Sequence, residues 1–198
     1  MLILALALAG QAATLPAEGV EAARICSALE VRSMISGPTL EAFSRALHLN
    51  LLAARATRGR ERMLDHLPVE QQIVMERVIA QTDDPALSTE CKVRFPQVWG
   101  TDVTLPSDGF DRATICVAAS VAIKNLAMAL GDTAETKRWD ALTERVSRLP
   151  ILSNAEHRRH GINSGEAGKD NADRMMRESL DSSGFLAISR SCEIAYPA

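Results

Sequence analysis

Apolar residues recur at intervals of three and four along most of this chain, which is the period of an α-helix. The clearest case is Leu40, Phe43, Leu47 and Leu51, which would share one face of a helix. Alternation of apolar and polar residues, typical of a half-buried strand, is nearly absent. The pattern therefore predicts an all-α protein. We expect helices over residues 16–35, 39–67, 68–81, 113–130 and 133–149, with a short helix through Cys91.

Residues that end or begin helices lie between these segments. Gly37 and Pro38 end the first helix, because Gly accepts the left-handed conformation of a helix end and Pro cannot continue the hydrogen-bond ladder. Pro68 suits the first turn of a third helix, where a missing N–H costs nothing. Gly131 and Asp132 predict the end of one helix and the cap of the next.

Two stretches of the chain resemble each other. Residues 75–96 and 176–197 align without a gap and share Met, Ala, Ser, Cys and Pro at equivalent positions. Upstream, the segment 24–26 is echoed by 114–116, and each of these segments ends in cysteine. We interpret this self-similarity as an internal repeat.

The repeat divides the chain into two tandem helical units that together form a helical bundle. We assign residues 13–96 to the first unit, 97–109 to a linker and 110–198 to the second unit. The first cysteines of the two units are 90 residues apart and the second cysteines 101 apart, so the second unit is longer. The glycine-rich stretch 161–171 is the flexible segment that could hold the additional residues, and we predict an inserted loop there.

The four cysteines fall into two equivalent pairs, one pair in each unit. This placement predicts disulfides within each unit, Cys26–Cys91 and Cys116–Cys192. Four cysteines allow three connectivities, and the sequence alone excludes neither of the other two. Free buried thiols in a reducing compartment are the remaining alternative.

The N-terminus predicts export. Residues 1–12 form an apolar run that ends in small residues, which fits a secretory signal peptide, although no Lys or Arg precedes the run. A lipid-anchored precursor would have cysteine where this chain has Gln11. We therefore expect a soluble mature protein in the periplasm or outside the cell.

Composition narrows the classes of partner. The net charge is −3 and the basic residues are interspersed with acidic ones, so we expect no nucleic-acid partner. The nearly apolar segment 113–130 could be a membrane span or a central buried helix. Lys124 near its middle favours the buried helix, and we expect no membrane span in the mature protein.

Candidate chemistry is sparse. His157 and His160 would be neighbours on a helix, but two imidazoles are fewer than the three or four ligands of a zinc site. No cofactor or catalytic motif is indicated. Arg158, Arg159 and Lys169 form a positive cluster beside or within the predicted loop, where they could contact a partner.

These features predict a non-enzymatic binding or interaction protein, whose partner is an unknown protein or small molecule. The alternative is a hydrolase or a metal-handling protein with a site near His157 and His160. An uninterrupted apolar groove would favour the binding protein. Carboxylates and a neutral histidine converging in a pocket would favour the alternative.

Overall fold

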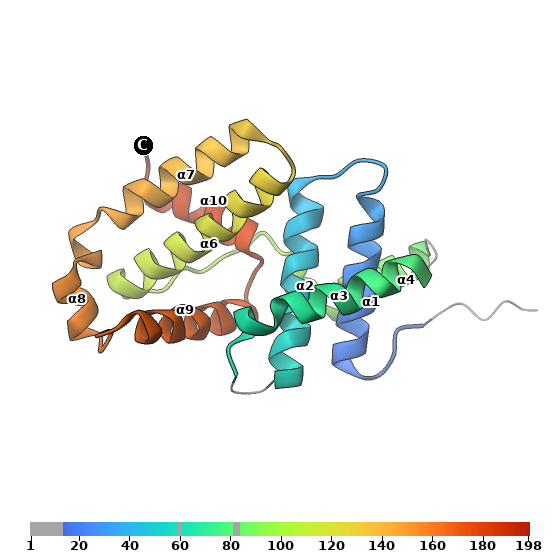
Figure 1. The fold of residues 1–198 in the computed structure, drawn as a ribbon. Helices are drawn as coiled ribbons and strands as arrows, with labels where there is room; N and C mark the ends of the chain where they lie inside the picture. The colour runs from blue at the N-terminus through green and yellow to red at the C-terminus, as the bar shows by residue number, and fades with distance from the viewer. Residues whose placement is uncertain (1–13, 59–60, 81–83) are drawn as a thin grey trace, which may run out of the picture.

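The computed structural model describes residues 14–58, 61–80 and 84–198, and every regular element within them is helical (Figure 1). The fold is therefore all-α, as the period of apolar residues predicts. The predicted signal peptide, residues 1–12, lies outside the described residues. The helices are α1 (Gly19–Ser33), α2 (Leu40–Arg58), α3 (Met63–Ala80), α4 (Pro85–Arg94), α5 (Pro96–Trp99), α6 (Gly109–Ala129), α7 (Thr133–Ser147), α8 (Asn154–Arg159), α9 (Gly165–Ser179) and α10 (Phe185–Ala195), with a 3-10 turn at Pro150–Leu152.

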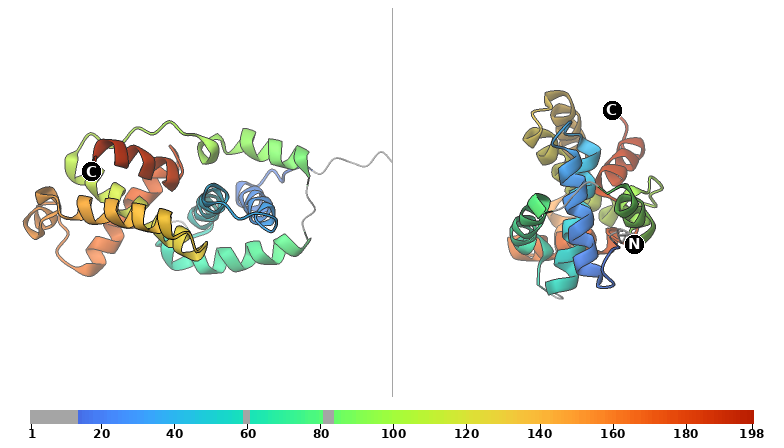
Figure 2. Two further views of the ribbon diagram at one scale, coloured as in Figure 1. Left: turned by 90° about the horizontal axis from the view of Figure 1, so that it is seen from above. Right: turned by 90° about the vertical axis from the view of Figure 1, so that its right-hand side faces the viewer.

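In the first half of the chain, α1 and α2 form an antiparallel pair (Figure 1). Ala22 and Ala23 of α1 and Ala53 and Ala54 of α2 are at most 1% exposed. Small buried side chains allow two helices to approach closely. Figure 2 shows α3 and α4 on opposite sides of this pair. The two faces of the α1–α2 pair are thus covered by different helices.

In the second half, α6 is the central helix and contacts α7, α9 and α10. α6 is also long and apolar enough to cross a membrane, a property that the core helix of a soluble protein can share. Its buried residues include Phe110, Ile115 and Ile123, each at most 2% exposed. α7 packs against it through Trp139 and Val146, which are fully buried.

Both predicted disulfides are present. Cys26 is bonded to Cys91 with their Cα atoms 5.7 Å apart, and Cys116 to Cys192 with their Cα atoms 5.6 Å apart. The first joins α1 to α4 and the second joins α6 to α10, so each bond lies within one half of the chain. Two disulfides are compatible with an extracellular or otherwise oxidising compartment.

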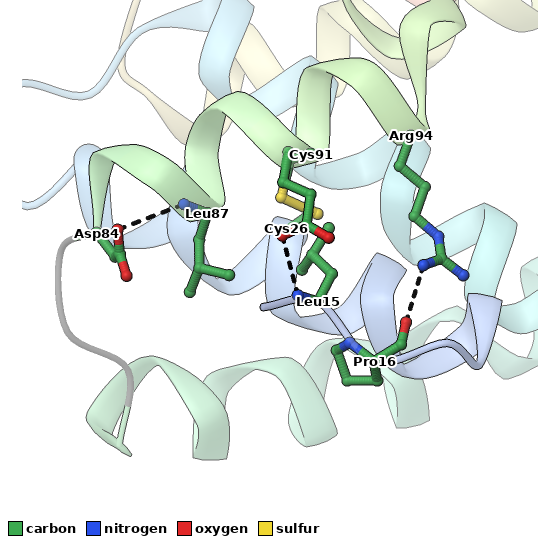
Figure 3. The surroundings of a disulfide bond; sticks show 8 residues. Leu15, Pro16, Cys26, Asp84, Leu87, Cys91 and Arg94 are labelled. Carbon is green, nitrogen blue, oxygen red and sulfur yellow. Dashed lines mark hydrogen bonds between the residues drawn. A yellow bond between two sulfur atoms is a disulfide. The ribbon is translucent and has the colours of Figure 1, made fainter. Parts of the chain in front are cut away.

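Polar contacts around the first disulfide hold the beginning of the described chain against α4 (Figure 3). The Leu15 amide donates to Oε2 of Glu90 at 3.0 Å, and the Arg94 guanidinium donates to the Pro16 carbonyl at 2.9 Å. Asp84 caps α4 by accepting from the Ala86 amide. The segment that precedes α1 is therefore held by hydrogen bonds to α4, the helix to which the disulfide also joins α1.

The predicted boundary between the second and third helices is wrong. α2 ends at Arg58 rather than near residue 67, and Pro68 lies inside α3 instead of beginning it. Pro68 is the sixth residue of α3, so the helix tolerates the loss of one backbone hydrogen bond and the crowding of a backbone carbonyl that an interior proline brings. In the sequence, Gly59 follows the last residue of α2 and was the better signal.

The loop predicted at 161–171 is also wrong from Gly165 onward, because α9 begins there. Ser164 caps the helix by accepting from the Ala167 amide at 3.2 Å. The first turns of α9 then bind the first half of the chain: Arg62 forms ion pairs with Glu166 at 2.7 Å and with Asp170 at 2.6 Å. These contacts stabilise a glycine-containing segment as a helix.

The two halves share a core. The largest buried cluster contains Leu49 and Leu51 of α2 together with Phe185, Leu186 and Ile188 of α10. α2 also contacts α6 directly. The halves are therefore packed against each other and are not separate bodies joined only by residues 100–108.

Candidate binding groove

A largely apolar groove of about 270 Å³ lies between α1, α2, α3 and the end of α6. We call it the apolar groove. Eight of its ten lining residues are apolar, and none is charged. The lining residues are Val31, Met34, Phe43, Ala46, Leu47, Asn50, Gln71, Val74, Met75 and Leu126.

Helical periodicity places these side chains on facing ridges. Phe43 and Leu47 are four residues apart on α2, and Gln71 and Met75 are four apart on α3. Residues at this spacing form a ridge along one helix face, and the space between two such ridges is a groove. Because α3 crosses the α1–α2 pair at an angle (Figure 1), it leaves part of that face uncovered.

The groove is open rather than enclosed. Five of its eight apolar residues keep contact with solvent, and Met75 is 53% exposed. Val31, Phe43, Leu47 and Leu126 are each half-buried. When a partner covers an apolar surface that the folded chain leaves exposed to water, the free energy of the system falls.

One polar side chain in the groove lacks a hydrogen bond. Asn50 is 5% exposed, and its Oδ1 has no hydrogen-bond partner among the described residues. A buried amide oxygen without a donor costs free energy compared with its hydrated state. If the Asn50 side chain rotated so that Oδ1 accepted a hydrogen bond from a bound partner, this free-energy cost would be removed.

His157 and His160 pack against an aromatic ring. His160 stacks on Phe110 with ring centroids 3.9 Å apart, and the edge of His157 meets the same ring at 5.1 Å. Nδ1 of His157 lies 3.0 Å from the Ser153 carbonyl oxygen. In the described part of the chain, no group of three or more His, Cys, Asp or Glu residues is placed to hold a metal ion.

The three basic residues assigned to an interaction loop lie in helices. Arg158 and Arg159 belong to α8, and Lys169 belongs to α9. Arg159 pairs with Glu156 at 2.6 Å and Lys169 with Glu166 at 2.9 Å, so two of the three charges have carboxylate partners nearby. None of the three basic residues lies in the short connection between α8 and α9, which spans residues 160–164.

A neutral histidine does occur in the protein, but it is closed to ligands. Burial lowers the pKa of His48 to about 4, and its side chain is 0% exposed. Its Nε2 is 2.9 Å from the Leu180 carbonyl oxygen. Asp181, the residue after Leu180, is paired with Arg55 at 2.7 Å. This arrangement is a structural contact and offers no base to a bound substrate.

Comparisons with known proteins assign no function to the groove. No protein-family model, curated protein or solved structure matches this chain.

Proposed function

We propose that this chain is a non-enzymatic binding protein whose apolar groove receives the apolar face of a helix from a partner protein. The observation that carries the proposal is the groove itself, an open surface about 270 Å³ in volume whose lining contains no charged residue. A helix that binds in such a groove buries apolar residues spaced three and four apart. Its buried stripe would be uncharged, because an unpaired charge is costly in this environment.

The openness of the groove favours a macromolecule over a small ligand. Sites for small molecules usually enclose most of the ligand surface. Here Met75 and Phe43 border an open surface formed by residues of four helices. A macromolecule covers such a surface more completely than a small molecule does. Met34 and Met75 add flexible, polarizable side chains, which adapt to the shape of a bound helix.

The proposed setting is the periplasm or the exterior of the cell. Both disulfides fit an oxidising compartment, and the apolar run at residues 1–12 fits an export signal. The partner would be present in the same compartment. It could be an exported protein or the exported part of a membrane protein.

We also infer that the two halves arose as a tandem repeat. Two features support this inference at the ends of the aligned segments. The Phe95 amide donates to the Cys91 carbonyl at 2.9 Å, and the Tyr196 amide donates to the Cys192 carbonyl at 2.8 Å. The aligned pair Val93 and Ile194 is also exposed in both halves, at 76% and 83%.

Met75→Glu should abolish groove binding and leave the fold intact. Met75 is half exposed, so the substitution removes few core contacts, while it places a charge where the partner's apolar stripe would lie. A fluorescently labelled, uncharged model helix with one leucine face and one glutamine face serves as the probe. Fluorescence anisotropy should show at least about a tenfold weaker affinity, equivalent to about 1.4 kcal/mol.

Val93→Glu is the matched control. Val93 is an exposed apolar residue on α4, on the side of the α1–α2 pair opposite α3 (Figure 2), so its substitution should leave the affinity unchanged. Equal affinities of wild type and Met75→Glu for the probe would contradict the proposal. Sedimentation that shows a dimer disrupted by Met75→Glu would instead identify a second copy of this chain as the occupant.

A photo-crosslinking amino acid at position 75 then tests for a natural partner. In intact cells it should give a discrete protein adduct that position 93 does not give. Crosslinks to lipid alone, or identical products from both positions, would overturn the assignment of a protein helix as the occupant.

A further inference from the structure

One face of α2 holds the turn between α9 and α10. Ser44, His48 and Arg55 lie on that face, because positions four and eleven residues apart differ by at most about 40° around a helix. The Leu186 amide donates to Oγ of Ser44 at 3.3 Å. Arg55 donates to both carboxylate oxygens of Asp181, at 2.9 and 2.7 Å. The turn is thus a polar junction between the two halves of the chain.

His48 lies at the centre of this junction with a single proton. Its Nε2 must donate to the Leu180 carbonyl oxygen, 2.9 Å away, because a carbonyl oxygen can only accept. Nδ1 is then unprotonated, and it has no hydrogen-bond partner among the described residues. A Cβ atom placed on Gly184 would lie 3.3 Å from Nδ1, so the ring is directly beneath the turn. A second proton would therefore be buried without an acceptor.

The charged groups that face His48 act in opposite directions. Burial is the largest influence and lowers the pKa of His48 to about 4, while its hydrogen bond to the Leu180 carbonyl raises it. The positive charge of Arg55 on α2 lowers the pKa further, and the negative charge of Asp181 in the turn raises it. Because Arg55 and Asp181 are paired with each other, their effects largely cancel and burial decides the outcome.

We propose that His48 is an acid-sensitive latch: its protonation releases the turn between α9 and α10 from α2 and loosens the contact between the two halves. A local opening of the turn breaks the few hydrogen bonds that one face of α2 makes to it, whereas the apolar core that α2 and α10 share remains as the other contact between the halves. The bonds Cys26–Cys91 and Cys116–Cys192 lie within the halves and hold each half together when the junction opens.

The direction of the pH effect follows from linkage. In the open form His48 is solvated and titrates near its ordinary pKa of 6.5, whereas in the closed form it titrates near 4. Below about pH 6.5 the open form binds the proton first, so the closed-to-open ratio falls about tenfold for each pH unit. The decrease stops near pH 4, at a total of roughly a hundredfold or more.

The latch also connects to the apolar groove. Leu126 belongs to the second half, whereas the other groove residues belong to the first. If the contact between the two halves loosened, Leu126 would move relative to the other residues of the groove. The latch itself does not depend on the proposed function, because the junction can be measured without any partner.

Hydrogen exchange at the Leu186 amide tests the latch. This amide is bonded to Ser44 across the junction, so its protection reports whether the turn is closed. After correction for the intrinsic effect of pH, protection in the wild type should fall by roughly a hundredfold between about pH 7 and about pH 4. His48→Gln keeps an N–H for the Leu180 carbonyl but cannot be protonated, so its protection should stay nearly constant.

His66→Gln is the control, because His66 pairs with Glu61 on the partly exposed surface at 2.6 Å and lies outside the junction. This variant should behave like the wild type. Acid loss of protection in His48→Gln equal to that of the wild type would overturn the latch. If His48→Gln fails to fold, an NMR titration of His48 in the wild type decides: a pKa near 4 supports the latch and a pKa near 6.5 overturns it.

Discussion

Replacing Cys116 and Cys192 together with alanine should lower the free energy of unfolding by about 4 kcal/mol. The bond joins residues separated by 76 positions, and a cross-link over that length removes much of the conformational freedom of the unfolded chain. Both side chains are 0% exposed, so the substitution also removes contacts in the core between α6 and α10. Urea denaturation followed by circular dichroism measures the loss.

The Cys26–Cys91 bond provides the matched comparison. Its separation of 65 positions is similar, and the entropic effect depends only on the logarithm of loop length. Its double alanine variant should therefore lose nearly the same free energy, and a difference between the two variants reports local packing. A loss below about 1 kcal/mol in both would show that the disulfides do not stabilise the fold.

Glu70→Ala should lower the free energy of unfolding by about 3 kcal/mol. Glu70 is 3% exposed and accepts two hydrogen bonds from the Arg24 guanidinium, at 2.8 and 2.9 Å. Thr57 donates a third, at 3.3 Å. Removing the carboxylate leaves a largely buried cation, whose remaining ion-pair partner among the described residues is Glu21 at 3.5 Å. The midpoint of urea denaturation should fall without a change in slope.

Two further variants separate the buried charge from the loss of side-chain volume. Glu41→Ala removes a half-exposed ion pair with Arg190, and it should cost less than about 1 kcal/mol. The double variant Arg24→Met with Glu70→Leu removes both charges, and it should recover most of the stability. Equal losses in Glu70→Ala and in the double variant would mean that packing, not the unpaired charge, is responsible.

Features that depend on neighbouring residues could be predicted from the sequence. Gly131 ends α6 with a φ of +72°, and Asp132 caps α7 by accepting from the Ala134 and Glu135 amides. Both follow from the sequence, because a left-handed glycine and a capping carboxylate act within a few residues. The buried stripe of α7 that includes Trp139 follows from helical periodicity in the same way.

The wrongly predicted elements show where local sequence patterns do not indicate the structure. Gly165 and Gly168 indicated a loop, but these residues lie in α9, whose first turns are bound by Arg62 from the other half. The helix is further anchored by the buried Asp173, which accepts from the Met63 amide at 2.7 Å. Partners more than a hundred residues away in the chain outweighed the local propensity of glycine.

The sequence by itself determined that the protein is helical and where several helices end, because periodicity and caps are local features. The tertiary structure decided among the three possible cysteine pairings, since each disulfide joins two helices that are distant in the chain. Only the tertiary structure decided which face of the α1–α2 pair stays uncovered, since that depends on the angle at which α3 crosses it. It also decided that His48 is buried beneath Gly184. Both outcomes arise from contacts between segments distant in the chain, and no local pattern records them.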